Sequence, residues 1–192
     1  YPWRRALMLA ENGEGLIFGI SENTQRKRIF QFSRPAYSKY VWLVTRSDAQ
    51  FKYNSLADLK GKSIGIINGF DYGDKFNQQK NVLFTVEADT NSATSRFNKL
   101  IKRRMDAMVI SARTDDPKSL EKNIKRRLMR DLRDSVPEKE LAIAVLRKPL
   151  FKDQLHFAVR IDKDDGLIKK IDAAIIKGRK LGLLDTDAQK LM

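Results

Sequence analysis

Residues 55–67 read SLADLKGKSIGII, and this stretch indicates the fold class. Ser55 and Asp58 have the spacing of a capping box, which predicts a short helix that ends at Gly61. Ser63–Ile67 is a compact apolar run of strand length, which predicts a buried strand. The stretch therefore predicts a short helix that leads through a glycine turn into a central strand.

The residues after this stretch continue the alternation of helices and strands. Residues 70–80 predict a helix, and residues 82–86 predict a strand. Another helix and a strand at 106–110 come next. The apolar face of that helix comprises Ala93, Phe97, Leu100 and Ile101. Consecutive strand–helix–strand units indicate an α/β fold with a largely parallel sheet.

The rest of the chain alternates in the same way. Trp3, Leu7 and Ala10 lie on one face of a predicted helix. The other predicted elements are strands at 16–20, 40–45, 141–146 and 155–159, a turn or short helix at 21–28, and helices at 118–133 and 167–178. Breaks between domains are expected near residues 37–40 and 148–149, and the continuous stretch between them has the length of one lobe.

Charge is the most unusual bulk property of the chain. The 192 residues include 38 Lys and Arg against 24 Asp and Glu, which gives a formal net charge of +14. This charge favours an anionic partner, namely nucleic acid, an acidic membrane surface or an anionic ligand, unless it is only a solvated basic surface. The basic clusters at 26–28, 99–104 and 122–133 lack interleaved aromatic residues and any nucleic-acid-binding motif. We therefore favour the solvated surface and expect no nucleic-acid partner.

The sequence also lacks the signatures of several kinds of site. It contains no cysteine, which excludes disulfides, thiolate metal sites and a cysteine nucleophile. No apolar run approaches the ~20 residues that a membrane-spanning helix needs. A nucleophile elbow, a Walker loop and a dinucleotide-binding glycine pattern are all missing. We therefore expect no catalytic residue, metal site or cofactor.

The single histidine and one acidic cluster have structural interpretations. His156 lies within a strand pattern and is interpreted as a residue packed beside a sheet rather than a general base. The carboxylates at 162–165 precede a helix that starts near Gly166. They are interpreted as turn and cap groups rather than a calcium loop, because Lys163 intrudes and no glutamate closes the loop.

Several segments resemble, in order, the motifs of one known family. They are Tyr1–Leu7 with Glu11–Glu14, Phe18–Ser21 with Thr24 and Arg26, Phe30–Tyr37, Ser55–Gly65, Met105–Val109 and Gly178–Leu184. The segment Ser55–Gly65 is very similar to the family's Ser-Leu-x-Asp-Leu-Lys-Gly-Lys-x-Val-Gly. The chain thus resembles the periplasmic solute-binding proteins of family 3, which serve ABC transporters for polar amino acids.

This resemblance implies a periplasmic-binding-protein-like fold: two α/β lobes joined by a two-stranded hinge, with the ligand between them. Lobe one would comprise residues 1–40 and 149–192, and lobe two would comprise residues 41–148. Family members carry a further N-terminal segment, so the resemblance also implies that lobe one is incomplete. It implies a monomer in the bacterial periplasm without cofactor. Its partners would be a small polar ligand, either an amino acid or an organic acid, and the membrane component of an ABC transporter.

The resemblance also assigns ligand-binding residues in lobe one. Arg26 aligns with the family arginine that binds the ligand α-carboxylate, a role that the planar guanidinium suits. Ser21 aligns with a hydroxyl residue that hydrogen-bonds the same carboxylate. The alternative is that Arg26 is one more surface charge within residues 25–28.

In lobe two, the resemblance points to one loop and one strand end. Gly69, Phe70 and Asp71 align with a loop that presents backbone N–H groups and a hydroxyl to the ligand. Ser111 stands where the family has an aspartate that pairs with the ligand α-amino group, and serine supplies no charge. Because losing one partner of a desolvated ion pair is costly, either Asp71 takes over this role or the ligand lacks an ammonium, as a dicarboxylate does.

Two other functions stay open at the level of sequence. The same fold could serve as a sensor or non-transport module of a larger protein. Alternatively, the basic chain could bind polyanions through its charge alone, with affinity that falls steeply as salt rises.

Overall fold

The structure is a computed structural model and describes residues 3–68, 70–89, 93–131 and 142–184. Helices and strands alternate through these residues, as the sequence predicts. No helix in this part of the chain is both long enough and apolar enough to cross a bilayer.

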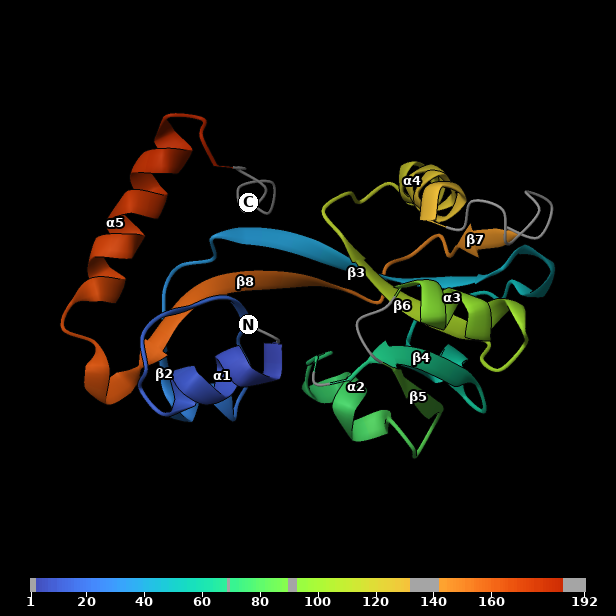
Figure 1. The fold of residues 1–192 in the computed structure, drawn as a ribbon, viewed down its shortest axis with the longest axis horizontal. Coiled ribbons are helices and arrows are strands. Elements are labelled where there is room, and N and C mark those ends of the chain that lie inside the picture. Colours follow the sequence, from blue (N-terminus) through green and yellow to red (C-terminus); the bar gives the residue numbers. More distant parts are fainter. Residues whose placement is uncertain (1–2, 69, 90–92, 132–141, 185–192) are drawn as a thin grey trace. The chain divides into compact units, whose positions relative to one another are not determined.

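The chain divides into two compact units. Unit 1 comprises Tyr1–Lys39 and Asp153–Met192, and unit 2 comprises Tyr40–Lys152. Strands β3 (Tyr37–Arg46) and β8 (Phe151–Arg160) each contain one of the boundaries. The chain therefore passes from one unit to the other within two strands (Figure 1).

Unit 1 is built around antiparallel strands. Strand β8 pairs with β1 (Ile17–Ser21) and with β2 (Phe30–Phe32). The register of β1 shifts at Gly19, whose φ of +82° favours glycine. The other elements are the helices α1 (Trp3–Glu11) and α5 (Leu167–Lys180) and the short 3-10 helices η1 (Arg26–Arg28) and η5 (Ile161–Lys163). The buried core of this unit contains Ala10, Ile17, Ile20, Phe30 and Ala158.

Unit 2 contains a mixed sheet. Strand β4 (Ser63–Ile67) lies between β5 (Thr85–Asp89) and β6 (Ala107–Ala112) and is parallel to both. Strand β3 pairs antiparallel with β6 and with β7 (Ile143–Val145). The α/β class is confirmed, but the expectation of a largely parallel sheet is wrong outside β4, β5 and β6. Helical crossovers join these three strands, and such connections make neighbouring strands parallel. Strand β3 pairs with strands that are distant in the sequence, so no short crossover sets its direction.

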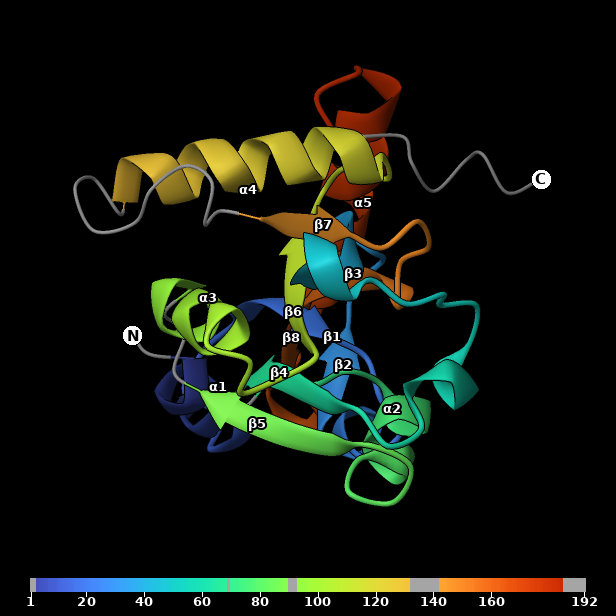
Figure 2. The ribbon, with the colours of Figure 1, turned by 90° about the vertical axis from the view of Figure 1, so that its right-hand side faces the viewer.

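Helices cover both faces of the sheet in unit 2. Helices α3 (Ala93–Ile101) and α4 (Pro117–Asp131) pack on one face. Helix α2 (Asp74–Gln79) and the 3-10 helix η3 (Leu56–Leu59) pack on the other (Figure 2). The two cores take alternate residues of β3, because successive side chains of a strand point to opposite faces. Trp42 and Val44 belong to the core beneath α3 and α4, and Val41 and Leu43 belong to the core beneath α2.

Residues 55–67 fold as predicted, into a short 3-10 helix followed by strand β4. Ser55 and Asp58 form a capping box at η3, and Asp58 accepts hydrogen bonds from the backbone N–H groups of Asn54 and Ser55 at 2.7 and 2.9 Å. A Cβ atom at Gly65 in β4 would lie 2.4 Å from the sulfur of Met105, which precedes β6. Glycine at this position therefore leaves room for the Met105 side chain against the strand.

The boundaries of two predicted elements differ from the structure. The helix predicted at 70–80 begins only at Asp74, because Asp71 closes a turn by accepting a hydrogen bond from the Gly73 N–H at 2.7 Å. The strand predicted at 82–86 begins only at Thr85, after Asn81 adopts a positive φ of 60° and redirects the chain. The helix predicted at 118–133 is confirmed as far as Asp131, and its last residues lie outside the described part of the chain.

Candidate functional site

Unit 2 contains a pocket of about 480 Å³ at the carboxyl ends of β4 and β6. Pockets for small molecules commonly measure about 300–1,000 Å³. Ligands of open α/β sheets bind at the carboxyl ends of the strands, which is where this pocket lies. The described residues that line it are Ile67, Phe70, Arg96, Met108, Ile110, Ser111, Leu120, Asn123, Ile124, Arg127 and Leu128. We call it the unit-2 pocket.

The walls of the unit-2 pocket come from both the sheet and the helices that cover it. Ile67 ends β4, and Met108, Ile110 and Ser111 belong to β6. Helix α3 contributes Arg96, and α4 contributes the remaining residues of the wall apart from Phe70. The polar groups of the lining are two guanidiniums, one carboxamide and one hydroxyl, and none of the described lining residues is Asp or Glu.

Arg96 holds a fixed position at this pocket. It is only 4% exposed, and its Nη1 donates a hydrogen bond of 2.5 Å to the carbonyl oxygen of Val109 in β6. Its charge also acts on a neighbouring phenol. Burial raises the pKa of Tyr72, while the hydrogen bond that the Ile67 N–H donates to the phenol oxygen and the positive charge of Arg96 act to lower it. Sequence reasoning did not single out Arg96.

Two of the residues assigned from the sequence line the unit-2 pocket. Phe70 does so from the loop after β4, and Ser111 from the end of β6. Residues 41 positions apart in the chain are thus brought to one pocket, because β4 and β6 are parallel neighbours. Their contact with a ligand stays a prediction.

Asp71 and Gly69 are the other two residues that the sequence assigned in this loop. Asp71 is not among the residues that line the pocket. Its Oδ1 accepts hydrogen bonds from the Gly73 N–H and from the Asn77 side chain, at 2.7 and 2.9 Å. This carboxylate therefore supports the turn before α2. Gly69 lies outside the described residues.

In unit 1, the structure brings Ser21 and Arg26 together. Arg26 is 8% exposed, and its Nη1 donates a hydrogen bond of 3.0 Å to the carbonyl oxygen of Ser21. The backbone N–H of Arg26 donates to Asn23 Oδ1 at 2.7 Å, which shapes the loop between β1 and η1. Arg26 is thus a buried residue, unlike its exposed neighbour Arg28.

The hydroxyl of Ser21 already has a partner. It donates a hydrogen bond of 2.8 Å to Asp153 Oδ2, and the same carboxylate oxygen lies 3.3 Å from Lys39 Nζ. Asp153 is 9% exposed, so it is a buried carboxylate with a cation and a hydroxyl beside it. To donate to a ligand carboxylate, the Ser21 hydroxyl would have to leave Asp153.

His156 and the acidic cluster of unit 1 have structural partners. His156 is 4% exposed, and its Nδ1 lies 2.7 Å from the carbonyl oxygen of Ser33. Asp164 accepts hydrogen bonds from the backbone N–H groups of Gly166 and Ile168, both at 3.2 Å, at the start of α5. This confirms a cap role at that position. No group of three or more His, Asp or Glu within the described ranges is arranged to hold a metal ion.

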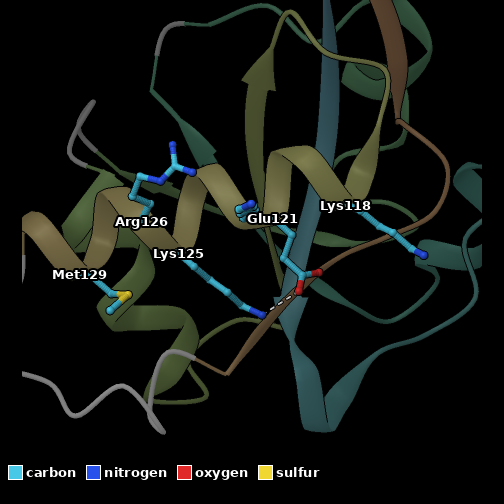
Figure 3. A pocket seen from close by; sticks show the side chains of 6 residues that line it. Lys118, Glu121, Lys125, Arg126 and Met129 are labelled. Atoms are coloured by element: carbon cyan, nitrogen blue, oxygen red, sulfur yellow. Dashed lines mark hydrogen bonds and ion pairs between the residues drawn. The ribbon is translucent and has the colours of Figure 1, made fainter.

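A second hollow, of about 430 Å³, lies along the outer side of α4 (Figure 3). Lys118, Lys122, Lys125, Arg126, Met129 and Glu121 line it. Glu121 pairs with Lys125 at 2.7 Å and accepts a hydrogen bond from the Val145 N–H at 3.1 Å. The basic residues of this hollow, which are Lys118, Lys122, Lys125 and Arg126, lie on the face opposite Leu120, Ile124 and Leu128, as the amphipathic pattern of α4 predicts. We call this set the α4 basic face.

Comparison with known proteins identifies the fold. No family model matches the sequence. A mutant of ArgBP from T. maritima superposes with a TM-score of 0.68 at 21% identity, over 95% of this chain and 71% of that chain. The amino acid ABC transporter substrate-binding protein AbpA from Streptococcus pneumoniae, bound to L-arginine, gives a TM-score of 0.67 at 19% identity, over 96% and 71% of the two chains.

The chain has the fold of amino-acid substrate-binding proteins. The GluR0 ligand-binding core in complex with L-glutamate shares it as well, with a TM-score of 0.66 at 17% identity over 92% of this chain and 72% of that chain. The periplasmic-binding-protein-like fold expected from the sequence is therefore confirmed. At these identities the similarity shows the fold alone, and the ligands of those proteins are properties of those proteins.

Proposed function

We propose that this protein is an extracytoplasmic solute-binding protein, which captures a small polar or anionic, amino-acid-like ligand for an ABC transporter and catalyses no reaction. The proposal includes a bacterial periplasmic location and a transporter membrane component as partner. The fold similarity to amino-acid substrate-binding proteins supports it. The sequence motifs that resemble family 3 support it independently.

The observation that carries the proposal is the unit-2 pocket. It combines apolar walls with a few polar side chains at the carboxyl ends of parallel strands, which is the usual composition of a small-molecule site. In the same fold, AbpA is bound to L-arginine and the GluR0 core to L-glutamate. Phe70 and Ser111 are the proposed ligand contacts of this unit, together with Arg96.

Arg26 and Ser21 are the proposed ligand contacts of unit 1. The burial of Arg26 supports this role, because a partly desolvated guanidinium binds a carboxylate more strongly than a solvated one does. Asp71 is less suited to contact the ligand, because its Oδ1 already accepts two hydrogen bonds within the protein. It is proposed to shape the loop that carries Phe70.

A thermal-shift screen of the chain against amino acids, dicarboxylates and polyamines tests the proposal. A ligand at one hundred times its dissociation constant should stabilise the protein by about 2.7 kcal/mol. Arg26→Ala should abolish this gain. The matched control Arg28→Ala removes the same charge at an exposed position and should keep it.

Two results would count against the proposal. The first is a folded sample that no compound of these classes stabilises. The second is chemical conversion of a bound compound, because a binding protein should return its ligand unchanged. Mass spectrometry of the ligand after prolonged incubation with the protein would detect such conversion.

A further inference from the structure

We infer that the α4 basic face, together with the exposed Met129 beside it, docks onto a membrane surface that contains anionic phospholipids. This inference goes beyond the proposed function, because it concerns the outer side of one helix and not the capture of a small ligand. It follows from the spacing, the charge and the exposure of the residues that line the hollow along α4.

The spacing of these residues places them on one side of the helix. Lys118, Lys122, Lys125, Arg126 and Met129 occupy positions i, i+4, i+7, i+8 and i+11 of α4. Positions with this spacing share one side of an α-helix, and these five extend over about 16 Å along its axis. Figure 3 shows the labelled members of the set extending from α4. The opposite side of α4 is buried in the core, so the helix is already folded when it meets a surface.

The charge of this face is positive and only partly balanced. Glu121 is the one carboxylate among the described residues that line the hollow. Its Oε1 lies 2.7 Å from Lys125 Nζ, and its Oε2 accepts the hydrogen bond from the Val145 N–H at 3.1 Å. The other three residues of the α4 basic face are exposed. Each Lys or Arg that comes close to an anionic membrane surface strengthens binding by about fivefold.

Met129 indicates a membrane as the partner. It is 46% exposed and follows Arg126 by three positions in α4. A bilayer presents anionic headgroups with apolar acyl chains beneath them, so it can bind the cations and bury the methionine at the same time. The apolar stems of Lys and Arg suit the same boundary, because their charged ends can reach the phosphates.

Nucleic acid fits this face less well. It offers phosphates to the cations, but proteins that bind single strands also stack the bases on exposed aromatic side chains. The described residues that line the hollow include no aromatic residue. A methionine among cations therefore favours a bilayer over a nucleic acid.

The charge of the whole chain acts in the same direction. A net charge of +14 attracts the protein toward an anionic surface, whereas contacts at short range decide which face meets it. Exposed charges are screened beyond about 8 Å at physiological ionic strength, so binding through this face should weaken as salt rises.

Co-sedimentation of the intact chain with phospholipid vesicles tests the inference. The chain should bind vesicles that contain phosphatidylglycerol and should not bind vesicles of phosphatidylcholine alone. Binding should weaken as the ionic strength rises to about 0.15 M. Absence of binding to the anionic vesicles at low salt would overturn the inference, and so would equal binding to both kinds of vesicle. The assay contains no amino acid or organic acid, so its result is independent of the proposed function.

A double variant tests whether the α4 basic face carries the binding. Lys122→Gln combined with Arg126→Gln should raise the Kd for anionic vesicles by about 25-fold. Lys169→Gln combined with Lys170→Gln is the matched control, because it removes two exposed cations from α5 and lowers the net charge equally. The control should change the Kd by less than about twofold. Equal weakening by the two double variants would show that net charge alone binds the vesicles, which would overturn the inference.

Substitution of Met129 tests the choice of partner. Met129→Gln should weaken vesicle binding about fivefold, and Met129→Leu should keep the affinity, because it keeps the buried apolar area. The control Val82→Gln removes an apolar side chain that is 81% exposed in the turn before β5, and it should leave the affinity unchanged. An unchanged Kd in Met129→Gln would contradict the membrane as partner. A duplex oligonucleotide that competes with the vesicles and binds more tightly than they do would assign the face to nucleic acid instead.

Discussion

Among the described residues, each unit contains one arginine that is almost completely buried, and the two arginines differ in their surroundings. Arg26 of unit 1 and Arg96 of unit 2 are 8% and 4% exposed. Both donate through Nη1 to a carbonyl oxygen of a strand, Arg26 to Ser21 in β1 and Arg96 to Val109 in β6. In unit 1, the hydroxyl of the same Ser21 binds the buried carboxylate of Asp153. In unit 2, the described residues lining the pocket beside Arg96 include no carboxylate.

This difference shows that burial of an arginine does not by itself define its role. Around Ser21, a carboxylate and the ammonium of Lys39 already balance one another. At the unit-2 pocket, the described lining contains two guanidiniums and no carboxylate. A buried arginine can therefore lie beside a buried carboxylate, as in unit 1, or at a pocket whose described lining has none.

The largest change in stability is expected from a substitution in the core beneath Arg96. Phe97, the next residue in α3, is fully buried in the core that α3 and α4 form with the sheet. Phe97→Ala should lower the free energy of unfolding by about 3–5 kcal/mol, through lost burial and a residual cavity. Urea denaturation measures this loss. A loss below about 1 kcal/mol would mean that the core collapses around the cavity or that α3 packs differently.

Single methionine substitutions of the two buried arginines compare their contributions to stability directly. Arg26→Met and Arg96→Met should each cost about 1.5–3 kcal/mol, because each removes a charged donor from a strand carbonyl. The exposed neighbours Arg28 and Lys102 provide controls, and their methionine variants should stay within about 0.5 kcal/mol of the parent. If Arg26→Met behaved like Arg28→Met in the same denaturation experiment, Arg26 would be one more surface charge, as the alternative from the sequence has it.

A smaller effect is expected where α4 is attached to the sheet. Glu121 accepts a hydrogen bond from the Val145 N–H of β7 and also pairs with Lys125 (Figure 3). Glu121→Ala should cost about 1–2 kcal/mol, because it removes a charged acceptor of a backbone N–H. Lys125→Ala removes only the ion pair and should cost about 0.5 kcal/mol or less. Equal losses in thermal denaturation would assign the stabilisation to the ion pair instead of the link to β7.

The smallest expected effect concerns one exposed carboxylate in each unit. Hydrogen bonds from the Asn54 and Ser55 N–H groups lower the pKa of Asp58 below its ordinary value of 3.8. In unit 1, the hydrogen bond from the Arg160 side chain likewise lowers the pKa of Asp162. The stabilisation from either group should be complete above about pH 5 and should be lost as pH falls from about 4 through the lowered pKa of the folded state.

Melting temperatures recorded between neutral and acidic pH measure this effect. Asp58→Asn and Asp162→Asn should each flatten the acid limb of the curve and bring the variant closer to the parent at low pH. A variant that stays parallel to the parent over the whole range would show that its carboxylate has the same pKa in the folded and unfolded states.

The sequence predicted most of the elements, because apolar periodicity and the capping box are local signals. The parallel pairing of β4 with β5 and with β6 is typical of strands joined by crossover helices. The antiparallel partners of β3 depend on contacts between distant segments. The start of α2 was missed by four residues, because the turn at Asp71 depends on side-chain hydrogen bonds that periodicity does not detect.

The candidate site was predicted less completely than the fold. Alignment with family motifs led to Phe70 and Ser111, and the structure places both in the unit-2 pocket. Arg96 was missed although its position carried a signal. It lies three residues after Ala93 and four before Leu100, at the edge of the apolar stripe, where a charged residue is unexpected. That its guanidinium reaches the Val109 carbonyl is a consequence of how α3 packs on β6, which the sequence pattern does not specify.

Because the chain crosses between the units in β3 and β8, the two units become complete at different times during translation. Unit 2 is one continuous segment, so all its residues are available once Lys152 has been synthesised. Strands β1 and β2 are made earlier, yet both pair with residues 155–160 of β8, which are translated only after the whole of unit 2. Unit 2 can therefore fold while the first part of unit 1 still exposes apolar residues such as Ile17 and Phe30. The time needed to translate unit 2 and then β8 thus sets how long these apolar residues must be protected from aggregation.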